Sequence, residues 1–185
     1  MGDRWSFPKQ ASAATYIWQP LIVSGYIISL PEYKEAWKIN LSTGIVSSAS
    51  IKGKIIAVTD RQIGYTGKWQ QDTLAVKSSD EKDASCSFTV KGTQIGMYGL
   101  ARQDGGYASI MIRNSKGEII LKSNVDMYSK YPALALKFLS PVLKKDTYTT
   151  TVTVLGEKWW WKEKSGRLSG SKGNVVSVER FVVSE

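Results

Sequence analysis

Short runs of alternating apolar and polar residues recur along this chain, separated by polar and glycine-rich stretches. In Ser85–Lys91, Cys86, Phe88 and Val90 fall on one face of an extended strand, which predicts a half-buried strand with Cys86 in the core. The run Thr147–Leu155 gives the strongest strand signal, because β-branched residues fill it. The same reasoning predicts strands at Gly53–Asp60, Gln94–Leu100, Tyr107–Arg113, Glu118–Ser123, Ala133–Leu139 and Asn174–Val183.

The connections between these strands are polar and carry turn residues. Gln71–Asp83 is predicted to be a surface loop, and Asn114–Gly117 a hairpin turn. No helical pattern extends beyond a turn or two. Many short strands with glycine-rich connections are typical of an all-β protein, and we predict an antiparallel β-sandwich.

Residues 1–50 differ in character, because aromatic residues stand there among prolines. Extended pieces are predicted at Thr15–Val23 and Tyr26–Leu30, and one helical turn at Pro31–Trp37. The segment is too short and too aromatic to fold alone, so we expect an aromatic extension, the end of a preceding domain, that packs on another domain. A change of composition near Ser47–Ser50 places the boundary, with residues 51–185 forming the sandwich.

The composition excludes several kinds of site. The chain has one cysteine and no histidine in 185 residues, so it contains no internal disulfide, Ser-His-Asp triad, Cys-His pair or Cys- and His-rich zinc site. The net charge of +9 suits an anionic partner, or serves solubility, since the lysines are widely spread. No apolar run reaches the ~20 residues that cross a bilayer, and the N-terminus lacks a secretory signal pattern.

The order of several motifs from residue 54 onward resembles a known family. The motifs are Tyr65, Gly67 and Trp69 in GYTGKW; Met97-Tyr98-Gly99; Val125, Asp126 and Tyr128; Thr147 to Lys158; and Val176 to Val183. Together they resemble the galactose-binding-like, jelly-roll β-sandwich modules that are appended to bacterial glycoside hydrolases. Glu179 stands where that family usually has Asp, and WWWKEKSGRLSGSK is an unusually aromatic and basic insertion.

The segment Thr15–Leu41 separately resembles the closing segment of enzymes related to family 43 glycoside hydrolases. The two resemblances imply a non-catalytic carbohydrate-binding or docking module in the C-terminal part of a longer glycan-degrading protein. They also imply a covalently linked or neighbouring catalytic domain. An extracellular or periplasmic location follows, as a fragment of a secreted protein.

Sugar binding needs flat apolar rings beside converging hydrogen-bonding groups, and the loops offer both. The candidate ligand-binding residues are Tyr65, Trp69, Arg102, Tyr107, Asp126, Tyr128, Trp159, Trp160 and Trp161. Trp69 begins a strand, which favours the core, and Tyr65 is open to either role. Consecutive tryptophans in a strand alternate faces, so Trp160 or the Trp159 and Trp161 pair is expected to be exposed.

Charged residues add two hypotheses. The lysines that flank the three tryptophans favour an acidic polysaccharide, or keep the loop soluble. Asp60 and Glu179 are candidates for a structural calcium site, since hard cations take oxygen ligands. Alternatively, Asp60 caps the turn toward Gly64 through its own backbone.

Three classes of function follow. Catalysis needs two carboxylates across a sugar, and nothing in the sequence pairs the loop candidates, so a binding module is favoured over an enzyme. The basic, tryptophan-rich loop also suits a single-stranded nucleic acid, which is held by stacking and phosphate neutralisation. A structural spacer domain is the third class, and it should bury Trp159–Trp161 against a catalytic domain.

Overall fold

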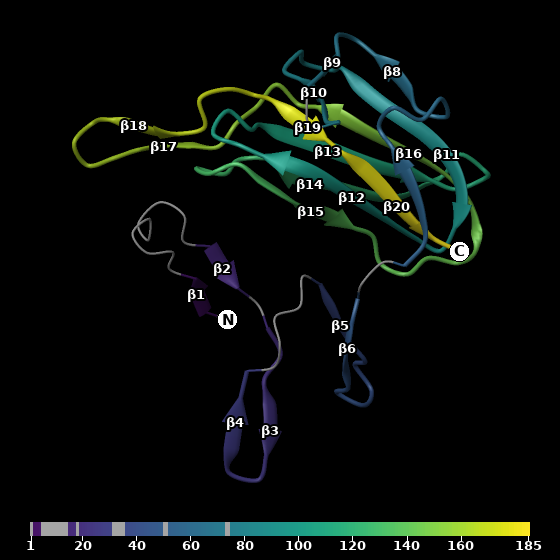
Figure 1. Cartoon of the computed structure of the whole chain (residues 1–185), viewed down its shortest axis with the longest axis vertical. Coiled ribbons are helices and arrows are strands. Elements are labelled where there is room, and N and C mark those ends of the chain that lie inside the picture. Colours follow the sequence, from purple (N-terminus) through teal and green to yellow (C-terminus); the bar gives the residue numbers. More distant parts are fainter. Residues whose placement is uncertain (1, 5–14, 18, 31–35, 50–51, 73–74) are drawn as a thin grey trace. The chain divides into compact units, whose positions relative to one another are not determined.

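The computed structural model describes residues 2–4, 15–17, 19–30, 36–49, 52–72 and 75–185. Contacts within the chain divide it into two compact units, Met1–Ser50 and Ile51–Glu185 (Figure 1). Residues 31–35, which fall within the predicted helical turn, lie outside the described residues. None of the described residues lies in a helix, so they include no helix long and apolar enough to cross a membrane.

The described part of the first unit contains antiparallel strand pairs. They are β1 (Gly2–Arg4) with β2 (Thr15–Ile17), β3 (Ile22–Ser24) with β4 (Ile27–Ser29), and β5 (Trp37–Ile39) with β6 (Val46–Ser48). Positive φ angles at Gly25 (59°) and Gly44 (70°) make the two tight connections, where glycine avoids a steric penalty. Of the predicted extended pieces, Thr15–Val23 contains β2 and the start of β3, and Tyr26–Leu30 contains β4.

The second unit is a β-sandwich of two antiparallel sheets (Figure 1). The five-stranded sheet has the order β14 (Ile119–Asp126), β13 (Tyr107–Arg113), β16 (Asp146–Val154), β11 (Ser85–Gly92), β8 (Gly64–Thr66). The four-stranded sheet has the order β15 (Ala133–Leu139), β12 (Gln94–Ala101), β20 (Arg180–Ser184), β7 (Lys54–Ala57). The predicted all-β antiparallel sandwich is confirmed.

The connectivity of the two sheets is that of a jelly roll. Among the strands of the two sheets, only the connections from β8 to β11 and from β13 to β14 stay within one sheet, and the others cross to the opposite sheet. A small sheet of β19 (Val176–Val178), β10 (Lys77–Ser79) and β9 (Gln70–Gln71) and a hairpin of β17 (Trp160–Lys162) and β18 (Leu168–Gly170) complete the unit. Because consecutive strands alternate between sheets, their loops gather at the two ends of the sandwich.

The core follows the predicted alternation. Cys86 and Phe88 are 1% and 3% exposed, and in β16 the side chains of Tyr148, Val152 and Val154 are buried. The outward positions of these strands are mainly serine and threonine, such as Thr89. Two predicted boundaries were wrong. First, part of the expected Gln71–Asp83 loop is a strand, β10, which pairs with β19. Second, the predicted last strand is divided at Glu179 into β19 and β20, and the carbonyl of Glu179 accepts a hydrogen bond from the amide of Val58, just after β7.

The thiol of Cys86 is expected to be unreactive in the folded protein. Burial raises its pKa to about 12, against the smaller lowering effect of the Lys77 charge, and only the thiolate is a nucleophile. Iodoacetamide at mildly alkaline pH should therefore leave Cys86 unmodified until denaturant is added, as measured by intact mass. Rapid alkylation without denaturant would show that β11 opens locally.

Candidate functional site: an aromatic row beside a polar cavity

A hairpin of tryptophans projects from one end of the sandwich (Figure 1). Its strands β17 and β18 pair with Trp160 opposite Gly170 and Trp161 opposite Ser169. The turn closes with hydrogen bonds from the backbone amide of Gly166 to the carbonyl of Glu163 (2.9 Å) and from the amide of Glu163 to the carbonyl of Arg167 (2.8 Å). We call this element, with Trp159, the tryptophan hairpin.

The tryptophans alternate between the faces of this hairpin. Trp159 and Trp161 share one face, with ring centroids 4.2 Å apart and planes inclined by 45°. Tyr128 extends the pair, since its ring centroid lies 5.2 Å from that of Trp159. Trp159 is 36% and Trp161 42% exposed, while Tyr128 is half-buried. These three rings form the aromatic row, which offers a partly solvent-facing apolar surface.

Backbone hydrogen bonds anchor the base of the hairpin to the loop after β12. The amide of Lys172 donates to the carbonyl of Gln103 (2.9 Å), and the amide of Val175 to the carbonyl of Asp104 (2.8 Å). Gly105 is required here, because an added Cβ would lie 1.9 Å from the carbonyl oxygen of Met127. Three segments far apart in sequence are thus held together at one end of the sandwich.

Arg102 joins the aromatic row to a neighbouring polar cavity. Its backbone forms a β-bridge with Tyr128, and its guanidinium donates to both carboxylate oxygens of Asp104, at 2.6 and 3.0 Å. This planar two-point pair fixes the direction of the side chain more firmly than a single contact. Arg102 therefore lines the cavity with a fixed side chain, while its backbone pairs with that of Tyr128.

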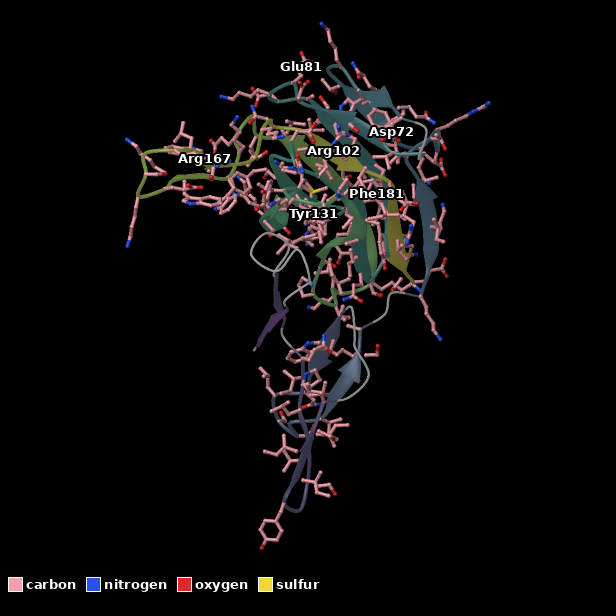
Figure 2. All side chains as sticks on the ribbon, turned by 60° about the vertical axis from the view of Figure 1, so that its left-hand side comes forward. Asp72, Glu81, Arg102, Tyr131, Arg167 and Phe181 are labelled. Atoms are coloured by element: carbon pink, nitrogen blue, oxygen red, sulfur yellow. The ribbon has the colours of Figure 1, made fainter. Side chains whose placement is uncertain are left out.

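The polar cavity has a volume of ≈ 500 Å³ and lies against the small β9–β10–β19 sheet. Its lining is Lys68, Gln70, Gln71, Asp72, Ser78, Ser79, Asp80, Glu81, Arg102 and Val175. Figure 2 labels Asp72, Glu81 and Arg102 in this part of the unit. Amide, hydroxyl and charged groups converge here, which is the hydrogen-bonding complement that sugar hydroxyls need beside an apolar surface.

Tyr65 and Trp69 are partly buried and pack against the core. The hydroxyl of Tyr65 donates to the carbonyl of Val58 (2.7 Å), and burial raises the pKa of Tyr65. The ring of Trp69 packs edge-on against Tyr65, with centroids 5.4 Å apart, and its Nε1 donates to the carbonyl of Thr66 (3.2 Å). These contacts give both rings a structural role.

Tyr107 and Asp126 are cross-strand partners of β13 and β14. Burial raises the pKa of Tyr107, and the negative charges of Asp126 and Glu157 add to the effect. The carboxylate of Asp126 accepts a hydrogen bond from the amide of Tyr128 (2.8 Å), so it fixes the start of the loop that carries that ring. Among the predicted ligand residues, Arg102 and Asp126 thus support the aromatic row through the backbone of its loops.

The two predicted calcium ligands have partners within the protein. The carboxylate of Asp60 accepts a hydrogen bond from the amide of Gln62 (3.0 Å), which is the turn-capping role weighed above. The carboxylate of Glu179 pairs with Arg180, whose guanidinium lies 3.9 Å from the ring centroid of Tyr98. Among the described residues, no group of three or more Asp, Glu or Cys is placed to hold a metal ion. Calcium at Asp60 and Glu179 stays a prediction.

Comparisons with known proteins concern the fold. No family model matches the sequence, and neither does any curated protein. The chain is similar to an exo-β-1,3-galactanase from Phanerochaete chrysosporium, with 16% identity and a TM-score of 0.47, over 99% of this chain and 40% of the galactanase. It is also similar to a family two carbohydrate esterase from Cellvibrio japonicus, with 10% identity and a TM-score of 0.46, over 71% of this chain and 33% of the esterase.

A third similar structure is CsCBM6-3 from Clostridium stercorarium, solved in complex with cellobiose. It is 12% identical, with a TM-score of 0.37, over 72% of this chain and 94% of that module. The chain spans 40% or less of the length of the two enzymes. Because all these TM-scores are low, no inference about function rests on the likenesses.

Proposed function

We propose that this chain is a non-catalytic carbohydrate-binding module, in which a sugar lies on the aromatic row of Tyr128, Trp159 and Trp161. The observation that carries the proposal is that three rings lie next to one another in space, with successive centroids 5.2 and 4.2 Å apart, and stay partly open to solvent. The C–H faces of a pyranose pack on such rings, while its hydroxyls need donors and acceptors at the rim. We propose that the polar cavity, which is lined by Arg102, the backbone partner of Tyr128, supplies those groups.

Three of the carboxylates near the row are engaged in holding the loops. Asp104 pairs with Arg102, and Asp126 accepts from the amide of Tyr128. Glu163 accepts hydrogen bonds from the hydroxyls of Ser169 and Ser165. These three carboxylates hold the loops in position, so they serve a binding site. We therefore prefer sugar binding to sugar hydrolysis as the function of this chain.

The proposal extends to the longer protein. The sequence resemblance of Thr15–Leu41 to the end of family 43-like enzymes supports a covalently linked catalytic domain. The corresponding location is extracellular or periplasmic, as part of a secreted glycan-degrading protein. In that setting the module would hold the enzyme near its polysaccharide.

The test is a glycan array followed by affinity measurements on variants of the aromatic row. For the best neutral glycan, Trp161→Ala should weaken binding by about tenfold or more, or about 1.4 kcal/mol, because a stacking surface is lost. The matched control is Trp160→Ala, which removes a tryptophan from the opposite face of the same hairpin and should leave this affinity unchanged. Circular dichroism checks that both variants fold.

Repeating the array with calcium and with a chelator shows whether binding needs the metal predicted at Asp60 and Glu179. The absence of binding to any glycan, together with a salt-sensitive gel shift of single-stranded DNA, would replace the proposal with nucleic-acid binding. Equal loss in the Trp160 and Trp161 variants would move the site off the aromatic row.

A further inference from the structure

The tryptophan hairpin has a second face that the aromatic row does not use. Trp160 and Lys162 alternate with Trp161 along β17, so they point to the opposite side, and Leu168 lies across from Lys162. Trp160 is 60% and Leu168 67% exposed. Gly170, the partner of Trp160, has no side chain to cover the indole. We call Trp160, Lys162 and Leu168 the second face.

The two faces carry different charged residues: Glu163 and Arg167, joined by a backbone hydrogen bond, lie on the side of the aromatic row, and Lys162 lies on the second face. On the side of the aromatic row, the carboxylate of Glu163 accepts a hydrogen bond from the hydroxyl of Ser169, which lies across from Trp161. On the second face, the exposed ammonium of Lys162 has no carboxylate partner among the described residues. A positive charge without a partner therefore stands two residues from an exposed indole.

We infer that the second face is a separate glycan-binding site, and that it takes an anionic sugar unit of the uronate class. The inference rests on the proposed function, because it assumes that the hairpin binds glycans. The indole of Trp160, with Leu168 beside it, accepts the C–H face of the ring, and Lys162 meets the carboxylate. The hairpin then holds one sugar on each side, neutral on the aromatic row and acidic on the second face.

The experiment uses polysaccharide pairs that differ only in their carboxylates. Polygalacturonate, alginate and hyaluronate are each compared with their carboxyl-reduced forms by affinity electrophoresis of the full chain. At least one acidic polymer should bind about tenfold more tightly than its reduced form. Trp160→Ala should weaken that binding by about tenfold, and Trp161→Ala by less than about twofold. Lys162→Gln should weaken it by about threefold, in line with an exposed ion pair.

Lys116→Gln is the matched control for charge. Lys116 is an exposed lysine in the turn between β13 and β14, so its removal lowers the net charge equally without touching the hairpin. If it weakens binding as much as Lys162→Gln, the attraction belongs to the net charge of the whole protein and the second site is rejected.

The outcomes separate this inference from the proposed function. If a neutral glycan binds through Trp161 but no acidic polymer exceeds its reduced form, the second site is overturned and the proposed function stands. If neither neutral nor acidic glycans bind, both fail. Binding to vesicles containing anionic lipid, but to no acidic polymer, would reassign the second face to a membrane surface.

Discussion

Phe181→Ala is expected to lower the free energy of unfolding by about 3–5 kcal/mol, the usual cost of removing a buried phenylalanine ring. Phe181 is fully buried in β20, and its ring centroid lies 4.5 Å from that of Phe88 in β11. These strands belong to different sheets, so the pair joins the two layers of the sandwich. Denaturant unfolding, followed by circular dichroism, measures the loss.

Leu134→Ala is the control for Phe181→Ala. It also removes a large apolar side chain from the four-stranded sheet, but Leu134 is 52% exposed and lies at the edge, in β15. The expected loss is below about 1 kcal/mol, because little buried surface and no cavity are involved. Equal losses in the two variants would show that Phe181 does not carry the contact between the sheets.

The layered fold was predictable because its signal is local. Alternation in Ser85–Lys91 assigned Cys86 and Phe88 to the core, and the β-branched run around Val152 marked the central strand of the five-stranded sheet. The sequence could not show that part of Gln71–Asp83 pairs with Val176–Val178. The strand in question, Lys77–Ser79, is polar and is held by hydrogen bonds to a segment far away in the sequence. Such pairing leaves no periodic pattern in the sequence.

The candidate site was predictable only in part. Alternation indicates that Trp160 and its two neighbours face opposite ways, and the structure agrees. The contact between the Tyr128 and Trp159 rings joins two loops that are far apart in the sequence, so no local sequence pattern predicts it. The polar cavity was missed for the same reason: of its lining, only Arg102 was among the sequence candidates.

The turn GYTGKW was predictable for one of its two rings. The sequence favoured the core for Trp69 and left Tyr65 open to either role; in the structure Tyr65 donates its hydroxyl to a backbone carbonyl and Trp69 packs against it. The side chain of Lys77 covers the Tyr65 ring, with Nζ 3.9 Å from its centroid. Burial of a ring depends on what the rest of the fold places over it, which composition alone does not reveal.

Gly170→Ala is expected to abolish binding to the aromatic row while the sandwich stays folded. Gly170 has φ +130°, which L side chains rarely adopt, and its added Cβ would lie 2.5 Å from the carbonyl oxygen of Trp159 and 2.6 Å from the Cα of Trp160. The backbone of Trp159 and of β17 must move to relieve these contacts, and these residues carry two of the three rings of the row, Trp159 and Trp161. We expect a loss of affinity of at least about tenfold, matching removal of a stacked ring.

Gly166→Ala separates the clash from backbone strain. Gly166 lies in the turn of the same hairpin with φ +86°, but an added Cβ would meet only Cε of Lys162, at 4.0 Å. This variant bears the cost of the positive φ, roughly 1–3 kcal/mol, without displacing Trp159. It should keep most of its affinity and the circular dichroism of the closely packed Trp159 and Trp161 rings, whereas Gly170→Ala should lose both. If both variants lose affinity to the same extent, backbone strain in the hairpin explains the loss. The position of the Trp159 ring would then not determine binding.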